Sequence, residues 1–206
     1  MIKKYTCYFV IIFFIISCGG SESEVAEESN ETAAYDRAEM LKHWADKIII
    51  PSYNSFSSSL SALDSKTKTF VETPNQANLS DLRTAWLNSY KAWQHVEMFD
   101  IGKAEEIFYK SKMNIYPVDK SWLENSVSTG NYGLDNANSY SSQGLPALDY
   151  LLNGVAASDN DIITKYTANN KYKNYLSAVV AKMVSNTKLV VDDWSIIIGG
   201  DSHTRM

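Results

Sequence analysis

Large apolar side chains recur every three or four residues between residues 82 and 99, a spacing that an α-helix places on one face. The stripe consists of Leu82, Trp86, Tyr90, Trp93 and Val96. Ser80 followed by Asp81 supplies an N-cap and an acidic first turn, and Gly102 is suited to ending the helix. Because three stripe positions are aromatic, we predict a helix that runs through Phe99 and is deeply buried along this face.

The same spacing recurs elsewhere in the chain and predicts an all-α fold, a helical bundle. One stripe contains Met40, Leu41, Trp44, Ile48, Ile49, Phe56, Leu60 and Leu63, and Pro51 should break or kink its helix. Shorter helices are expected over residues 121–127 and 147–153 and after Ser158, and a last helix over residues 172–197. The chain has only 4 Pro and 9 Gly, few for a β-protein with many tight turns.

The first residues have the features of a bacterial lipoprotein signal. Lys3 and Lys4 precede an apolar run over residues 8–16, which is too short to cross roughly 30 Å of hydrocarbon. A small residue then precedes Cys18, as in the lipobox of bacterial lipoproteins. We predict that residues 1–17 are a signal peptide and that Cys18 is lipidated, which anchors the protein in the bacterial envelope, at the periplasmic or surface face of the outer membrane. The alternatives are an uncleaved anchor or a secretory signal with an incidental cysteine.

Residues 18–34 are expected to form an acidic, disordered tether. This stretch carries five glutamates and no basic residue, with too few apolar side chains to offset the entropy of ordering. It resembles the export signals of surface lipoproteins, but a simple spacer would have the same composition. The whole chain has 19 Lys and Arg against 24 Asp and Glu, a net charge of -5, so nucleic acid is not an expected partner.

The common catalytic motifs are absent from the sequence. It contains no glycine-rich phosphate loop, no paired CxxC and no HExxH. His43 and Asp46 share a helix face and could ligate a metal, although such a pair is more often a solvated contact. We therefore predict no catalytic residues.

Three blocks together resemble the N-terminal part of the imelysin-like family. The first block spans residues 85–102 and includes Trp93, Glu97 and Gly102; the second is NIYPVD at residues 114–119. The third, QGLPALDYLL at residues 143–152, aligns with the family's Gly-x-His-x-x-Glu, followed by an aromatic residue and two leucines. The resemblance covers roughly residues 40 to 198. It implies helical bundles, a bacterial envelope location and a role linked to iron acquisition, with an older label of metallopeptidase.

The chain departs from the family motif at two positions. Pro146 stands where the family has His and offers no ligand atom, and Asp149 stands where the family has Glu. Glu97 and Asp100 could join Asp149 in an oxygen-rich site for Fe(III), Ca(II) or another divalent or trivalent cation. Alternatively, the acids line the bundle and bond to Tyr, Trp or Arg groups. Gly144 and Pro146 are expected to shape the loop-to-helix junction.

The resemblance also implies that a second bundle is missing, as in a truncated or frameshifted reading frame. We expect residues 35–206 to form one imelysin-like helical domain. Our functional prediction is a lipid-anchored, non-catalytic binding protein linked to the acquisition of iron or haem, whose partners are the membrane, iron, haem or iron-uptake proteins. The alternatives are a metal-dependent peptidase and a surface adhesion or scaffold module.

Overall fold

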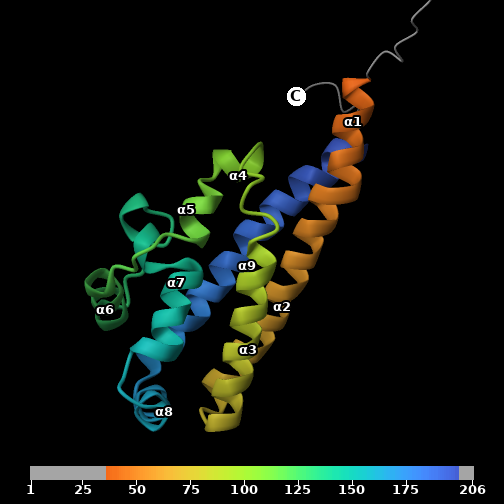
Figure 1. Ribbon diagram of the computed structural model, residues 1–206. Coiled ribbons are helices and arrows are strands. Elements are labelled where there is room, and N and C mark those ends of the chain that lie inside the picture. Colours follow the sequence, from red (N-terminus) through yellow and green to blue (C-terminus); the bar gives the residue numbers. More distant parts are fainter. Residues whose placement is uncertain (1–35, 200–206) are drawn as a thin grey trace, which may run out of the picture. The chain divides into compact units, whose positions relative to one another are not determined.

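Three long helices form the framework of the protein. The computed structural model describes residues 36–199, with side chains described to residue 195. In that range the chain is helical and contains no β-strand, which confirms the predicted all-α bundle. Helix α2 (Ile50–Glu72) packs against both α3 (Gln76–Trp93) and α9 (Asn170–Gly199), and the shorter helices α4 to α8 adjoin α3 and α9 (Figure 1).

Helix α2 continues from α1 (Arg37–Trp44) through a π-helical turn at Ala45–Ile49. Pro51 lies in the first turn of α2, where its missing N–H removes no necessary hydrogen bond. The prediction that Pro51 breaks its helix is therefore wrong; the irregularity is the π-helical turn that precedes it. The prediction that Trp44 and Ile48 belong to the apolar stripe is wrong, because each is 48% exposed. The π-helical turn buries Ile49, as predicted, together with Ala45.

Helices α2 and α3 are joined by a short turn, and α3 begins five residues earlier than predicted. Asn75 is the N-cap, since its side-chain oxygen accepts a hydrogen bond from the backbone N–H of Asn78 at 2.9 Å. The prediction of Ser80 as the cap is wrong, and Ser80 and Asp81 lie within the helix. Asn and Ser are both favourable N-cap residues. The helix begins after Asn75, which comes earlier in the chain.

The end of α3 also differs from the prediction. The helix stops at Trp93 and gives way to turns, so Gly102 does not end it. Instead Gly102 has φ +60° and is the N-cap of α4 (Lys103–Glu106). The backbone N–H of Lys103 donates to Oδ2 of Asp193 on α9 at 3.1 Å. Trp86 and Tyr90 are half-buried, so of the three aromatic residues only Trp93 is as deeply buried as predicted.

Three short helices follow the predicted order: α6 (Lys120–Thr129), α7 (Gly144–Asp149) with its π-helical continuation Tyr150–Gly154, and α8 (Asp159–Ala168). The helix α5 (Tyr109–Met113) and a 3-10 turn at Ala137–Ser142 were not predicted. Ser158 caps α8 as predicted, because its hydroxyl accepts a hydrogen bond from the N–H of Asp161.

None of the helices in the described range combines the length and apolar character that a bilayer crossing demands. The predicted signal peptide, Cys18 and the acidic tether lie outside the described residues.

Candidate functional site

The motif segment, residues 143–153, enters α7 by a very close backbone approach. Gly144 has φ +76°, a conformation that residues with a side chain rarely adopt. A Cβ atom there would lie 2.3 Å from the carbonyl oxygen of Met113 and 2.7 Å from that of Lys112. Gly144 therefore lets the start of α7 pack directly on the end of α5.

Side chains from three other helices hold the motif segment, and Ser142 directly before it, by their backbone carbonyl groups. Trp86 Nε1 on α3 donates to the carbonyl of Leu145 at 3.0 Å. The hydroxyls of Tyr175 on α9 and Tyr166 on α8 donate to the carbonyls of Ser142 (2.7 Å) and Leu151 (3.2 Å). These bonds fix the segment through its backbone.

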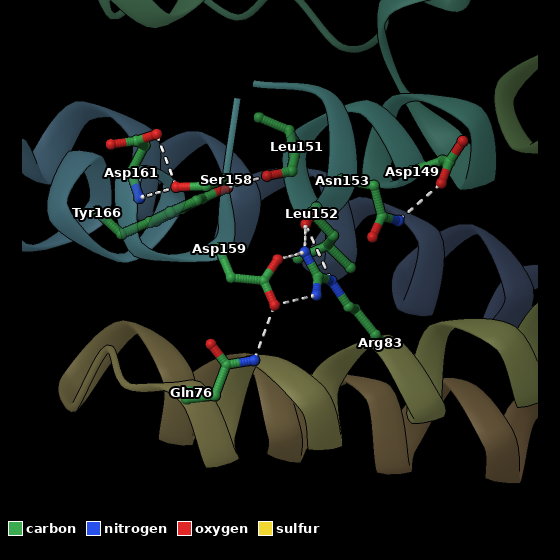
Figure 2. Close-up of polar contacts among 10 residues, drawn as sticks. All are labelled: Gln76, Arg83, Asp149, Leu151, Leu152, Asn153, Ser158, Asp159, Asp161 and Tyr166. Carbon is green, nitrogen blue, oxygen red and sulfur yellow. Dashed lines mark hydrogen bonds and ion pairs between the residues drawn. The ribbon is translucent and has the colours of Figure 1, made fainter. Parts of the chain in front are cut away.

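Arg83 on α3 makes the most extensive of these contacts (Figure 2). Its Nε and one terminal nitrogen donate to the carbonyl of Leu152 at 3.1 and 2.8 Å. Its two terminal nitrogens also bind both carboxylate oxygens of Asp159, at 2.9 and 2.7 Å, and Gln76 adds a third donor at 2.8 Å. The hydrogen bonds from Arg83, and secondly that from Gln76, lower the pKa of Asp159 to about 2.

The depressed pKa of Asp159 predicts a specific pH dependence. Its carboxylate favours the folded state above the unfolded-state pKa of about 4, and this contribution is lost as the pH falls through about 2. The Asp159→Asn protein should therefore be less stable than the wild type at pH 6, and the difference should shrink below pH about 4. Urea denaturation at a series of pH values measures this. A stability difference that does not change with pH would contradict the charged pair.

The two positions at which the chain departs from the family motif, 146 and 149, are not part of the buried core. Asp149 is exposed, and its Oδ1 accepts a hydrogen bond from Asn153 Nδ2 at 2.8 Å. Pro146, three residues earlier, is half-buried. In Figure 2 the Asp149–Asn153 pair lies to one side of the Arg83–Asp159 pair, and no interaction joins the two. Asp149 is thus available to a ligand from solution.

The aromatic helix was predicted to run through Phe99 and so to include Glu97, but both Glu97 and Asp100 follow the end of α3. Glu97 Oε2 accepts a hydrogen bond from the buried indole of Trp93 at 3.1 Å, as the alternative interpretation of a bundle-lining acid expected. Asp100 is exposed, and after burial it is the second cause of the raised pKa of Tyr53.

The structure does not bring the three predicted metal ligands together. Within residues 36–195, no three or more His, Cys, Asp or Glu side chains are grouped so as to hold a metal ion. This also applies to His43 and Asp46, which gain no third ligand of these types there. Metal binding by Asp149, Glu97 or Asp100 stays a prediction.

A polar cluster beside the motif was missed by the sequence analysis. The carboxylate of Glu124 on α6 accepts hydrogen bonds from the hydroxyls of Tyr150 at 2.8 Å and Tyr172 at 2.5 Å. Lys165 donates to the Tyr172 hydroxyl at 3.1 Å. Burial, followed by the hydrogen bond to Glu124, raises the pKa of Tyr150 to about 12. No local spacing links residues 124, 150 and 172, so no signal in the sequence could have found the cluster.

Comparisons with known proteins agree with the all-α fold. The family model described as Imelysin, of the peptidase M75 type, matches residues 49–197. A curated relative is Iron-regulated protein A of Synechococcus elongatus, 26% identical over 98 residues, which cover 48% of this chain and 28% of the relative. A solved structure of an imelysin-like protein from Psychrobacter arcticum 273-4 has a TM-score of 0.59 at 20% identity. That match covers 77% of this chain and 50% of the solved one, so the chain spans half or less of both proteins.

Proposed function

Because the chain belongs to the imelysin family, we propose that it is a non-catalytic binding protein linked to iron acquisition. The observation that carries this proposal is the state of the motif on α7: the segment is firmly held, while Asp149 is exposed and Pro146 offers no ligand atom. The segment can therefore present a carboxylate, but it lacks the histidine of the family motif.

Hydrolysis at a metal needs protein ligands, an open coordination position and a general base. In this motif the only side chain that could serve is Asp149, whose nearest polar partner is the amide of Asn153. A single carboxylate supports the binding of a ligand rather than the cleavage of a peptide. The competing function, a metal-dependent peptidase, is favoured by the peptidase M75 label of the family model.

The link to iron rests on the name of the relative, Iron-regulated protein A, and on ligand chemistry. Exposed carboxylates such as Asp149 and Asp100 suit hard cations. Since the described residues form no group of three such ligands, we propose that iron arrives within a complex that supplies the remaining ligands, such as a chelate or haem.

A calorimetric titration tests the proposal. The full chain is titrated with Fe(III) supplied as its nitrilotriacetate complex, and with Zn(II) and Ca(II). We expect saturable binding of the iron complex that weakens at least about tenfold, roughly 1.4 kcal/mol, in Asp149→Ala. The matched control is Glu72→Ala, which removes an exposed acid at the end of α2.

Equal binding by all three proteins, or none by a folded sample, would contradict iron binding at the motif. Cleavage of a peptide mixture that a chelator abolishes would favour the peptidase. Folding of each variant is checked by circular dichroism beforehand.

We also propose that a lipid on Cys18 anchors the protein in the envelope, and that residues 18–34 hold the domain away from the membrane. The support is the lysine pair, the short apolar run and the small residue before Cys18. Cys18→Ser is expected to move the protein from the membrane fraction to the soluble fraction in its bacterial host. Retention of the variant in the membrane would favour an uncleaved anchor.

A further inference from the structure

Lys112 on α5 is a buried lysine whose charge is poorly compensated. The residue is only 9% exposed. Within residues 36–195 its one ion pair is with Oδ1 of Asp135, at 3.9 Å, and its ammonium lies 5.6 Å from the ring centre of Tyr140. A buried ammonium is costly unless it is paired and hydrogen-bonded. The ion pair of Lys112 with Asp135 is thus a long one for a lysine that is largely buried.

A second lysine points to the same carboxylate oxygen. Lys182 Nζ on α9 contacts Oδ1 of Asp135 at 2.5 Å, and the Lys182 side chain is largely buried. The carboxylate, by contrast, is 76% exposed and comes from the loop between α6 and α7. Two largely buried cations thus converge on one surface anion.

An unsatisfied donor occupies the same face of α9. Asn186 follows Lys182 by four residues, so the two share a helix face. The Asn186 side chain is 3% exposed, and its Nδ2 has no hydrogen-bond partner in the part of the chain that the structure describes. The adjacent Thr187 bonds to the Tyr109 hydroxyl at 2.7 Å, which places α5 against this stretch of α9. Buried donors without a partner are uncommon in folded proteins.

The charges of these three side chains do not cancel, which favours the binding of an anion. Lys112 and Lys182 carry two positive charges and Asp135 one negative charge, so the cluster has a net charge of +1. Removal of Asp135 would leave two ammonium groups facing one position. The hydrogen bond from Lys182 lowers the pKa of Asp135, so this carboxylate is an ionised occupant of the position.

We propose that Lys112 and Lys182 form a binding site for a carboxylate anion, and that Asp135 occupies this site in the unliganded protein. A ligand carboxylate displaces the exposed Asp135 and contacts both ammonium groups. A carboxylate is the group indicated because the occupant already there is one. The site is separate from Asp149 and does not depend on the proposed role in iron acquisition.

The test is an NMR titration of the full chain at constant ionic strength with acetate, citrate and inorganic phosphate as probes. We expect citrate to bind, with the largest shifts in residues 110–114, 133–137 and 180–188. Asp135→Asn removes the internal competitor and should tighten citrate binding about two- to fivefold, the range that an exposed ion pair allows. Lys112→Met and Lys182→Gln should each weaken it at least about tenfold.

The matched control is Lys188→Gln, which removes an exposed lysine of α9 that pairs with Asp192 and leaves the cluster intact. Its binding should equal that of the wild type. If Lys112→Met fails to fold, Lys182→Gln and Asp135→Asn carry the test alone. The proposal is overturned if citrate at about 10 mM causes no shifts in the wild type and Asp135→Asn. It is also overturned if phosphate binds more tightly than citrate, or if the lysine variants bind as the wild type does.

Discussion

Replacement of Gly144 by alanine is expected to lower the free energy of unfolding by about 2 to 5 kcal/mol. About 1 to 2 kcal/mol follows from the left-handed backbone at φ +76°. A further 1 to 3 kcal/mol follows from the new Cβ, which would overlap the backbone carbonyls of Met113 and Lys112, atoms that cannot move aside as a side chain can. Urea denaturation followed by circular dichroism measures the change.

Gly130 is a matched control for this substitution. It has the same φ of +76°, but a Cβ there would meet no atom within 4 Å. Gly130→Ala should therefore lose only the backbone contribution, about 1 to 2 kcal/mol. If the two alanine variants are equally stable, α7 does not approach α5 as closely as the structure shows.

The second large effect is expected for Trp93→Ala, which should lower the free energy of unfolding by about 3 to 5 kcal/mol. Trp93 is 1% exposed, and its ring lies 5.6 Å from that of Phe56 and 5.5 Å from that of Tyr109. Truncation would leave a cavity between α2, α3 and α5. Thermal or chemical denaturation measures the loss.

Glu97→Gln separates packing at Trp93 from its hydrogen bond. The glutamine side chain keeps an oxygen that can accept the indole hydrogen bond now made to Glu97. We expect this variant to lose no more than about 1 kcal/mol. A loss as large as that of Trp93→Ala would mean that the Glu97 charge, and not ring packing, stabilises this region.

The sequence predicted the type of each main helix better than its limits. Helical spacing is a local property, so the stripes around Leu82 and Leu176 were informative without knowledge of the fold. Distant partners hold the segment that follows α3: the Tyr53 hydroxyl binds the carbonyl of Phe99, and Asp193 binds the backbone N–H of Lys103. Contacts between residues 46 or 90 positions apart leave no mark in a local pattern.

For the candidate site, too, the sequence predicted the location but not the contacts between distant residues. The motif segment was located from its own residues, and Gly144 was expected at a loop-to-helix junction. The contacts that hold the segment were not predicted, because Arg83 and Leu152 are 69 residues apart and the bond involves a backbone carbonyl. The proposed site at Lys112 and Lys182 was missed for a similar reason, since a lysine in a sequence gives no indication of its burial.

The contacts that hold the motif segment determine which amino-acid substitutions it can accept. Arg83, Trp86, Tyr166 and Tyr175 all bind carbonyl oxygens, which every amino acid possesses. Substitutions of the half-buried Pro146 and the exposed Asp149 therefore leave the partners of these contacts in the chain. A chain built in this way can lose a histidine or shorten a carboxylate without losing the position of the helix. Its binding chemistry can accordingly diverge from that of its relatives while the architecture is inherited unchanged.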